Sequence, residues 1–525
     1  MAHDMSVNAT MMSPAIIRLI GQHLTRPHLI TSLRVCSVWH KVLEPFLWET
    51  LILQNQPCNH TPRQATPTLC LKNRHHIRHL VETGSNSLLK FLAFSTAPRL
   101  PLRLTSIRVS LLSPEILMIT QQNTDTLTSF SCRSNRLRRG EADQEAQGLW
   151  YRQLFMILEM VPQLTDLSIG PAVLIDPPTV VFSKVARSLK RLELDRVKVA
   201  DRCWYDDTIQ SSQALSTLDQ FPKLETLIMV WNDLPPLCQL ELIRKSPKLK
   251  SLTWKRSTKL LFEAWLSSTL PPPASLSALD VAHSHVGDED MARILAMAPC
   301  LTSLNVRSTP FGPLSCAQLL EHHAPNIIML DVADCLQVSS EMVMTLLNSL
   351  PSLLRFSANR VKAEDIAGPL LHTMSGGPPP PQPLSTSWAC RDLMELEISI
   401  VGLHSCENPT PAQARCLILE QLSKLKSLEI LCLGEDVSTL GAEEEWLDLT
   451  LAHDLDKLSS LTRLKTLDIR NLKAKMGKDE IDWMARVWGK LEVVRGKLNG
   501  DLKASEARAL ARQLKNKRPD MFYSE

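Results

Sequence analysis

A short apolar pattern returns along this chain at an almost constant interval. In its clearest copies the first apolar residue is Leu249, Leu276, Leu301, Ile327 and Leu353, so neighbouring copies lie 27, 25, 26 and 26 residues apart. Each copy has the form Leu-x-x-Leu-x-apolar, which is typical of a short strand with one buried face. A unit of this length cannot bury both of its apolar faces alone, so the chain must stack one unit on the next.

The pattern extends well beyond these five copies. Others begin at Leu164, Leu224, Leu393, Leu425 and Leu464, and weaker ones at Ile77, Leu104, Leu127, Leu189 and Leu491. Apolar residues at helical spacing precede some of the strands, as in residues 316–323 and 342–347. Each unit is therefore predicted to contain a strand, a loop and a helix, which indicates an α/β fold with a parallel sheet.

A period of about 20–29 residues with this pattern resembles the leucine-rich repeat. The resemblance implies one curved solenoid over about residues 76–500, with its parallel sheet on the concave side. Many such repeats carry an Asn or Cys a few positions after the last Leu, where it forms hydrogen bonds in the turn. In this chain that residue appears only sporadically, as at Cys335, so the copies resemble the irregular repeats of fungal F-box proteins. Segments of loop composition near 131–150, 375–390 and 434–446 are predicted to be insertions that leave the stack unbroken.

Residues 12–48 do not follow the repeat and read MSPAIIRLIGQHLTRPHLITSLRVCSVWHKVLEPFLW. Ser13 can cap a helix that has Pro14 in its first turn, Pro27 lies in a break, and Pro45 stops a third helix. We therefore predict about three short helices. Their apolar residues lie on more than one side, so the excess apolar face requires either another chain or the rest of this one.

This segment resembles the F-box motif. The matching residues are Met12-Ser13-Pro14-Ala15-Ile16, His28-Leu29, Val35-Cys36-Ser37-Val38-Trp39 and Pro45-Phe46-Leu47-Trp48. The sequence departs from the motif at Ala15, where the family prefers Glu, and at His28, where it prefers Asp. The resemblance implies docking on a Skp-type adaptor through Pro14, Ile16, Leu29, Leu33, Val35 and Trp39.

The order of the motifs resembles that of F-box/leucine-rich-repeat proteins. It implies a substrate-receptor subunit of an SCF-type cullin-RING ubiquitin ligase, which binds the adaptor, and through it cullin, with the F-box and a protein target with the repeats. Three alternatives stay open: a generic three-helix subdomain, a non-ligase scaffold whose helices only cap the solenoid, and an inhibitor that uses the concave surface alone. The predicted domains are a disordered N-terminus at 1–11, the F-box at 12–53, a linker at 54–75, the repeat array at 76–500, and a C-terminal helix and tail at 501–525.

Charge and cysteine content narrow the range of partners. The formal net charge of +3 favours neither nucleic acid nor a membrane surface. Thirteen cysteines include no CxxC pair, and the first ten residues lack the apolar core of a secretory signal. We therefore expect a reducing compartment, cytoplasmic and/or nuclear. No stretch of the sequence reaches the roughly 20 apolar residues of a membrane span.

Sequence signatures of catalysis are absent. The chain has no Walker loop, no G-x-S-x-G and no H-E-x-x-H motif, so we expect neither an enzyme nor a cofactor. His75, His76 and His79 lie close together, but no cysteine or carboxylate completes a metal set nearby, and we predict solvated loop histidines. Cys203 and Cys416 have no catalytic signature and are predicted to be small buried residues.

Charged residues do gather in two places. The basic run at 136–139 is followed at once by Glu141, Asp143 and Glu145, which favours a solvated loop over a nucleic-acid or import signal. The second place is a column of the predicted sheet, at the residue after the second Leu, which should face the concave solvent side. The acidic residues of this column are Glu193, Asp280, Asp331, Glu397, Glu429 and Asp468.

This acidic column allows two interpretations. Strands about 4.8 Å apart would stack like charges at a cost to folding, so the column suits a basic segment of a target. The alternative is a row of ordinary polar residues, partly neutralised by Arg191, Arg307, Arg355 and Arg470 on the same face.

Overall fold

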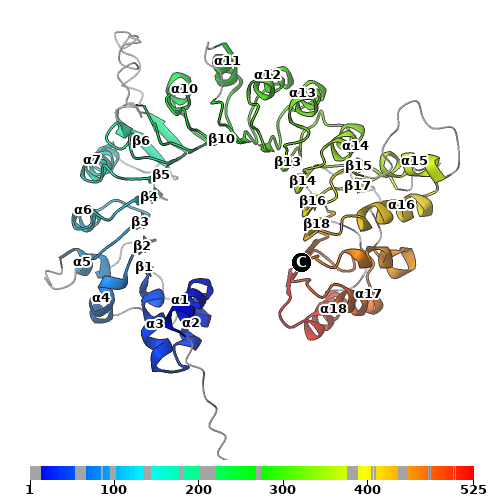
Figure 1. The fold of residues 1–525 in the computed structure, drawn as a ribbon, viewed down its shortest axis with the longest axis horizontal. Helices are drawn as coiled ribbons and strands as arrows, with labels where there is room; N and C mark the ends of the chain where they lie inside the picture. Colours follow the sequence, from blue (N-terminus) through cyan, green and yellow to red (C-terminus); the bar gives the residue numbers. More distant parts are fainter. Residues whose placement is uncertain are drawn as a thin grey trace, which may run out of the picture. The chain divides into compact units, whose positions relative to one another are not determined.

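Strands and helices alternate along most of the 525-residue chain in the computed structural model (Figure 1). The structure describes residues 13–53, 67–83, 87–94, 102–133, 144–176, 181–199, 220–267, 273–374, 388–403, 406, 409–434, 447, 449–470, 472, 474–500, 502 and 504–524. The chain forms two compact units, Met1–Lys248 and Leu249–Glu525.

The first unit begins with three helices, α1 (Pro14–His23), α2 (Arg26–Ser32) and α3 (Ser37–Trp48). The strands and helices that follow are β1 (Thr50–Leu53), α4 (Pro67–Asn73), the 3-10 helix η1 (Arg74–His76), β2 (His79–Glu82), α5 (Ser87–Phe94), β3 (Ser106–Val109), α6 (Pro114–Gln121), β4 (Ser129–Arg133), α7 (Gln144–Met160), β5 (Asp166–Gly170), β6 (Ala172–Leu174), β7 (Arg191–Asp195), β8 (Val197–Val199), β9 (Thr226–Val230) and α10 (Pro236–Arg244). The strands β1, β2, β3, β4, β5, β7 and β9 pair in that order, all parallel, and β6 pairs with β8.

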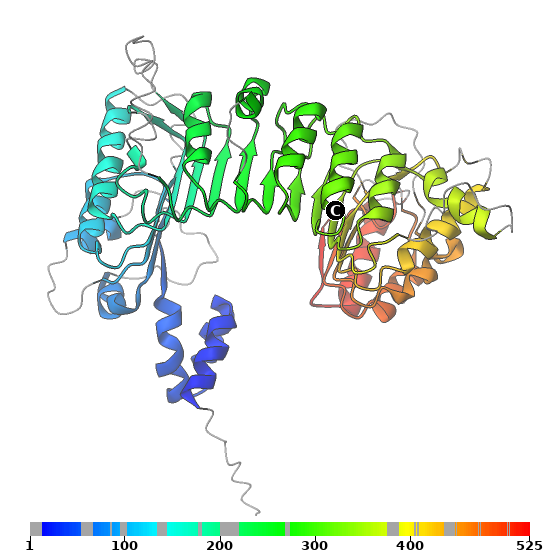
Figure 2. The same cartoon turned by 45° about the horizontal axis from the view of Figure 1, so that its top comes forward.

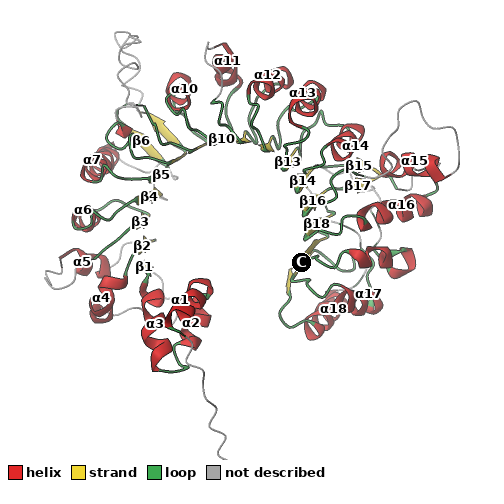
Figure 3. Ribbon diagram, viewed as in Figure 1, coloured by secondary structure: helices red, strands yellow, loops and turns green. Residues whose placement is uncertain are grey.

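The second unit repeats the same arrangement. Its elements are β10 (Ser251–Lys255), α11 (Lys259–Ser267), β11 (Ala278–Asp280), α12 (Asp288–Met297), β12 (Ser303–Asn305), α13 (Pro313–His323), β13 (Met329–Asp331), α14 (Ser340–Ser349), β14 (Arg355–Ser357), β15 (Val361–Lys362), α15 (Ala363–Met374), β16 (Glu395–Glu397), β17 (Ile400–Val401), α16 (Pro411–Ser423), β18 (Ile430–Cys432), the 3-10 helices η5 (Leu451–His453) and η6 (Leu455–Ser460), β19 (Thr466–Asp468), α17 (Lys478–Val487), β20 (Val493–Arg495), α18 (Ala504–Lys517) and β21 (Phe522–Ser524). Figure 3 shows helices α11 to α14 on one side of this unit and the strands on the other.

Strand register in the second unit places the second apolar residue of each repeat in one buried row. Leu279 lies opposite Leu304, Leu304 opposite Leu330, and Leu330 opposite Phe356, and each of these side chains is at most 2% exposed. The pairing continues in parallel through β16, β18, β19, β20 and β21. The predicted α/β fold, with a parallel sheet built from leucine-rich repeats, is confirmed by this register.

Some predicted boundaries differ from the structure. The sheet begins at β1, before the predicted start of the array at 76, and α4 lies inside the segment predicted as a linker. At the other end β21 pairs with β20, so the sheet continues through the predicted tail. Of the predicted insertions, residues 134–143, 375–387 and 435–446 lie outside the described residues, as do 1–11.

One repeat was placed in the wrong register by the sequence pattern. Leu425, Leu428 and Leu431 recur every third residue, so two overlapping copies of the pattern fit this segment. In the structure Leu431 lies opposite Leu396, which makes Leu428 the first leucine of this repeat. Leu425 is also buried, as a residue just past the end of α16, and local spacing could not distinguish the two alternatives.

Neighbouring repeats are joined by a carboxylate as well as by apolar packing. Asp288, the first residue of α12, accepts hydrogen bonds from the backbone N–H groups of Gly312 (2.9 Å), Leu314 (3.0 Å) and Ser315 (2.9 Å) at the start of α13. These N–H groups have no partner within their own helix, so the carboxylate of one repeat caps the helix of the next. A Cβ on Gly312 would lie 2.8 Å from Asp288 Oδ2, so a side chain there would require the capping carboxylate to shift.

A buried histidine joins the same two helices. The side chain of His323 is fully buried, its Nε2 donates to the carbonyl oxygen of Leu295 at 2.9 Å, and its Nδ1 has no hydrogen-bond partner. Burial lowers the pKa of His323 below its usual 6.5, and the neighbouring His322 acts in the same direction. The bond to Leu295 opposes this shift without overcoming it.

We predict that acidification destabilises the second unit through His323. Because its pKa is lowered on folding, the unfolded chain binds the proton more tightly, so stability is full above about pH 6.5 and falls as the pH drops below that value. Thermal unfolding followed by circular dichroism between pH 7.5 and 5 should show this loss. His323→Gln keeps a donor for Leu295 and should flatten the profile; an unchanged profile would assign the acid sensitivity to other groups.

Candidate protein-interaction surfaces

The three N-terminal helices enclose a small apolar core of their own. Ile17, Leu29 and Leu43 are buried at its centre, and Leu33 and Trp39 pack against them. Gly21 permits the close approach of α1 and α3, since a Cβ there would lie 2.6 Å from Leu43 Cδ2. Ser13 caps α1 by accepting from the N–H of Ala15. Leu29, Leu33 and Trp39, predicted to bind an adaptor, therefore contribute mainly to the packing of this subdomain.

The other predicted adaptor residues are exposed. Pro14 lies at the surface, Ile16 is 49% exposed and Val35 is 64% exposed. The structure adds Leu19, 60% exposed and one helical turn after Ile16 on α1, and Val38, 39% exposed in the first turn of α3 and three residues after Val35. This spacing was the signal in the sequence that could have identified them. We name Pro14, Ile16, Leu19, Val35 and Val38 the exposed apolar set.

The helical subdomain is attached to the first repeats through α3. Helix α3 packs against η1, and the carbonyl of Glu49, just after α3, accepts from the N–H groups of Arg78 and His79 at 2.9 Å. Figure 2 shows α1, α2 and α3 beside the first strands of this unit. The exposed apolar set remains accessible to solvent in the presence of this contact.

Two histidines at the junction differ from expectation. His75 and His76 lie in η1, half-buried, with ring centroids 3.7 Å apart, so they are not solvated loop residues. Burial lowers the pKa of His76. The neighbouring His75 and Arg78 lower this pKa further, whereas Glu44 of α3 raises it. His79 lies in β2 of the first repeats. Among the residues that the structure describes, no three His, Cys, Asp or Glu side chains are grouped to hold a metal ion.

The two departures from the F-box motif have different surroundings. Ala15 is exposed in the first turn of α1. His28 Nδ1 lies 2.9 Å from the hydroxyl of Thr25, the residue before α2, so the histidine takes part in the local turn. Cys416 is half-buried on α16, whereas Cys203 and the basic run 136–139 lie outside the described residues.

Each carboxylate of the predicted acidic column has a cationic partner. Glu193 pairs with Arg133, Asp280 with Lys255 (2.8 Å), Asp331 and Glu397 with Arg307 (3.0 and 3.2 Å), Glu429 with Lys465 (2.6 Å), and Asp468 with Arg470 (2.9 Å). These contacts support the interpretation that the column is neutralised. Glu429 does not belong to the column, because the register places Cys432 opposite Glu397.

The column has a structural role where it carries a short side chain. Asp280, Asp331 and Asp468 each accept a hydrogen bond from the backbone N–H two residues later, at 3.1–3.2 Å. Asn305, at the same position of its repeat, makes the same bond to Arg307 N–H. This turn requires a side-chain oxygen and no charge, which explains why Asn replaces Asp.

The turn leads into a left-handed residue in successive repeats of the second unit. The φ angles of Arg256, His283, Ser308 and Asp334 lie between 56° and 60°. None of these residues is glycine, although non-glycine residues rarely adopt this conformation. The bend directs the chain away from each strand, and three of the four side chains, those of His283, Ser308 and Asp334, line a groove.

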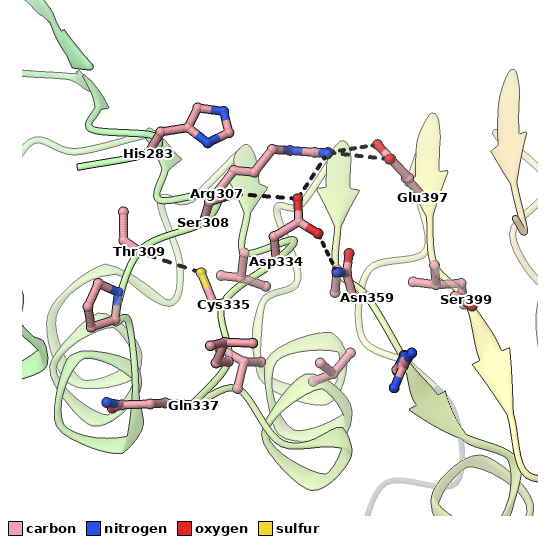
Figure 4. A pocket seen from close by; sticks show the side chains of 18 of the residues that line it. His283, Arg307, Ser308, Thr309, Asp334, Cys335, Gln337, Asn359, Glu397 and Ser399 are labelled. Carbon is pink, nitrogen blue, oxygen red and sulfur yellow. Dashed lines mark hydrogen bonds and ion pairs between the residues drawn. The ribbon is translucent and has the colours of Figure 1, made fainter. Parts of the chain in front are cut away.

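Arg307, which follows β12, contacts residues of three other strands of the second unit, and Figure 4 shows it beside Asp334 and Glu397. Its guanidinium donates to Asp331 on β13 at 3.0 Å, to Ser357 on β14 at 2.9 Å and to Glu397 on β16 at 3.2 Å. It also lies 3.8 Å from Asp334. Burial alone would lower the pKa of Arg307, but Asp331 and Glu397 more than offset this, so its pKa is raised.

The pKa of Asp331, a partner of Arg307, also depends on burial and on this ion pair. Burial raises the pKa of Asp331, and Arg307 opposes that shift. We name Arg307, Asp331, Ser357 and Glu397 the Arg307 network. It joins residues up to 90 positions apart, which no local pattern in the sequence could have indicated.

A groove of about 1000 Å³ lies beside this network. It is lined by the turns that follow β11, β12, β13, β14, β16, β18 and β19, with His283 at one end and Arg470 at the other. Leu336, in the turn after β13, is 99% exposed. Sequence reasoning did not identify this groove, since the turns that line it share no residue type.

The comparisons with known proteins find only low similarity to this chain. No protein-family model matches the chain, and no curated protein matches it. Among solved structures, an internalin from Listeria monocytogenes aligns with a TM-score of 0.36 and 15% identity, covering 70% of this chain and 82% of its own. A leucine-rich-repeat protein from Leptospira interrogans aligns with the same TM-score and identity, covering 88% of this chain and 99% of its own. The description of this chain as a leucine-rich-repeat array rests on its own period and strand register.

Proposed function

We propose that this protein is the substrate-receptor subunit of an SCF-type cullin-RING ubiquitin ligase. The N-terminal helices would bind a Skp-type adaptor, and the repeats would bind a protein target. Such a subunit acts by proximity, because it raises the effective concentration of target lysines near a ubiquitin-charged enzyme. It has no active site of its own in this proposal.

The exposed apolar set is the observation that carries the proposal. The helical subdomain already has its own core and its own attachment to the first repeats. Ile16, Leu19 and Val35 nevertheless remain about half exposed or more. An excess of exposed apolar side chains on a small subdomain is typical of a protein-binding surface. Their position in a segment that resembles the F-box favours a Skp-type adaptor as the partner.

One contact favours a second role for the N-terminal helices, and the same experiment tests that role. The packing of α3 on η1 would also be made by a helical cap whose only task is to cover the end of the repeat array. A cap requires that contact alone. An adaptor-binding subdomain requires the exposed apolar set as well.

The experiment co-expresses the chain with a Skp-type adaptor and measures co-purification. Charged side chains in an apolar interface are costly to desolvate, so Ile16→Glu with Val35→Glu should reduce adaptor recovery at least about tenfold. Leu237→Glu is the matched control, since Leu237 is 60% exposed on α10, outside the helical subdomain. Trp39→Ala is less informative, because Trp39 packs on the internal core.

The result separates the roles. Adaptor recovery at the wild-type level in the double variant would contradict docking through this face. A wild-type chain that recovers no adaptor would leave only the capping role. Mass spectrometry of the purified complex should show cullin peptides if the ligase assignment is correct.

A further inference from the structure

One position of the repeat carries apolar side chains on three successive repeats of the second unit. It directly follows the first apolar residue of the pattern, and we name its residues Ile328, Leu354 and Met394 the apolar row. The N–H of Leu354 donates to the carbonyl oxygen of Ile328, and the N–H of Met394 to that of Leu354, both at 2.8 Å, so the three residues are adjacent. The other repeats of this unit carry polar or charged residues at this position: Lys250, Ser277, Thr302, Glu429, Lys465 and Glu492.

The apolar row lies on the solvent side of the sheet. Ile328 is 39% exposed, and Leu354 and Met394 are half-buried. The apolar residue directly before each of them is buried in the core. Met329, the next residue after Ile328, adds a side chain that is 37% exposed. Adjacent apolar side chains left open to solvent on one face of a sheet are typical of a surface that binds a partner.

A hollow of about 230 Å³ lies on the same strands. Its lining includes Met329 and Ile430, which the strand register places in one row with Arg355 and Glu395 between them. Arg355 and Glu395 form an ion pair at 3.1 Å. The apolar row therefore lies beside a recess that can accept side chains of a partner.

The strands of the apolar row carry one more carboxylate than the cations that pair with them. β13, β14 and β16 contribute Asp331, Glu395 and Glu397, which pair with Arg307 and Arg355, so one negative charge is left over. Glu397 is the most exposed of the three carboxylates, with a side chain 48% exposed, whereas that of Arg307 is 29% exposed. A partner with a cationic side chain next to its apolar surface is therefore complementary to this face.

The spacing of the apolar row indicates a helical partner. Strands lie about 4.8 Å apart, so the first and third residues of the row are roughly 10 Å apart. On one face of an α-helix, residues i, i+3 or i+4, and i+7 span about 10.5 Å. Alternate residues of an extended chain advance about 6.8 Å, so the third would lie roughly 14 Å from the first. A helix laid across the strands matches the row, whereas an extended segment does not.

We propose that the apolar row binds an amphipathic helix of the target protein. The helix presents apolar residues at i, i+3 or i+4, and i+7 to Ile328, Leu354 and Met394, and Lys or Arg on its flank to Glu397. This inference names the class of target segment for the function proposed above and rests on that function.

The probe is a fluorescein-labelled peptide, Ala-Gln-Ala-Leu-Lys-Gln-Ala-Leu-Ala-Gln-Leu-Lys-Gln-Ala-Leu-Lys-Gln-Ala, measured by fluorescence anisotropy with the purified full chain. Its leucines share one side of a helix, and its lysines lie beside them. A second peptide has Glu in place of each Lys. A third exchanges the second and fourth Leu each with the Gln two residues before it, which moves them to the opposite side. We expect the first peptide to bind at least about fivefold more tightly than the second and about tenfold more tightly than the third.

Two variants, each with a control, locate the binding surface. Ile328→Gln removes an apolar contact and should weaken binding about five- to tenfold. Leu260→Gln should leave binding unchanged, because Leu260 is 69% exposed on α11, on the helical side of the same unit. Glu397→Gln keeps an acceptor for Arg307 but removes the charge, so it should reduce the preference for the Lys peptide at least about threefold. Its control is Glu341→Gln on α14.

Equal affinity for the first peptide and either of the others, or equal loss in Ile328→Gln and Leu260→Gln, would overturn the proposal. A dimer of the chain that sedimentation detects, and that Ile328→Gln abolishes, would assign this face to a second copy and overturn it as well. If Ile328→Gln proves unstable, Glu397→Gln still decides the result. The adaptor assay is independent of these peptides, so a chain that binds adaptor without preferring the first peptide contradicts only the target class, and the reverse pattern contradicts only the ligase assignment.

Discussion

Arg307→Ala should lower the free energy of unfolding of the second unit by about 2–3 kcal/mol. The substitution removes the donor shared by Asp331, Ser357 and Glu397, and leaves two carboxylates without their common cation. The Arg307 side chain is 29% exposed and that of Asp331 is 24% exposed, so solvent compensates only in part. The substitution also removes the side chain that links residues of three strands, β13, β14 and β16.

Urea unfolding of the full chain measures this effect. The control is Arg355→Ala, because Arg355 pairs with Glu395 at 3.1 Å on the same sheet face, but its side chain is 52% exposed. An exposed pair of this kind contributes at most about 1 kcal/mol. If both variants lost the same small amount, Arg307 would be an ordinary surface ion pair. Arg307→Lys should recover little, since an ammonium cannot reach several partners with a planar fork.

Asp288→Ala should cost about 2–3 kcal/mol, the second large effect. A single capping oxygen typically contributes about 1 kcal/mol, but here one carboxylate accepts from three N–H groups at the start of α13. Its negative charge also lies at the positive end of that helix dipole. Because Asp288 belongs to the preceding repeat, the substitution weakens the interface between two repeats as well as one helix end.

Two substitutions separate hydrogen bonding from charge. Asp288→Asn keeps one acceptor oxygen and should lose about half as much stability. Glu289→Ala removes the neighbouring exposed acid on α12 and should change stability by less than about 0.5 kcal/mol. Equal losses for Asp288→Ala and Glu289→Ala in thermal unfolding would show that general charge near α12, and not the cap, sets the stability.

The sequence alone determined the architecture. Leucines at a period of 25–27 residues predict parallel strands with one buried face, because a unit of that length has too little apolar surface of its own and must be stacked. Ser13 and Pro14 likewise predicted the start of α1. The other two proline predictions were wrong, because Pro27 lies in the first turn of α2 and not in a break, and Pro45 lies inside α3 and does not stop it. These are local properties of spacing and backbone restriction. They failed where spacing was itself ambiguous, as at Leu425 and Leu428.

Only the tertiary structure decided which charged and apolar side chains remain accessible. The sequence pattern placed Asp280 and Asp468 in a charged column that faces solvent. In the structure each side chain accepts a backbone hydrogen bond that forms a turn, and each is paired with a cationic side chain. Leu29 and Val35 belong to one apolar motif, yet the packing of the helices buries the first and exposes the second. The physical reason is that accessibility and ion pairing depend on neighbours brought together by stacking, such as Arg307 and Glu397, whereas the repeat depends on residues close along the chain.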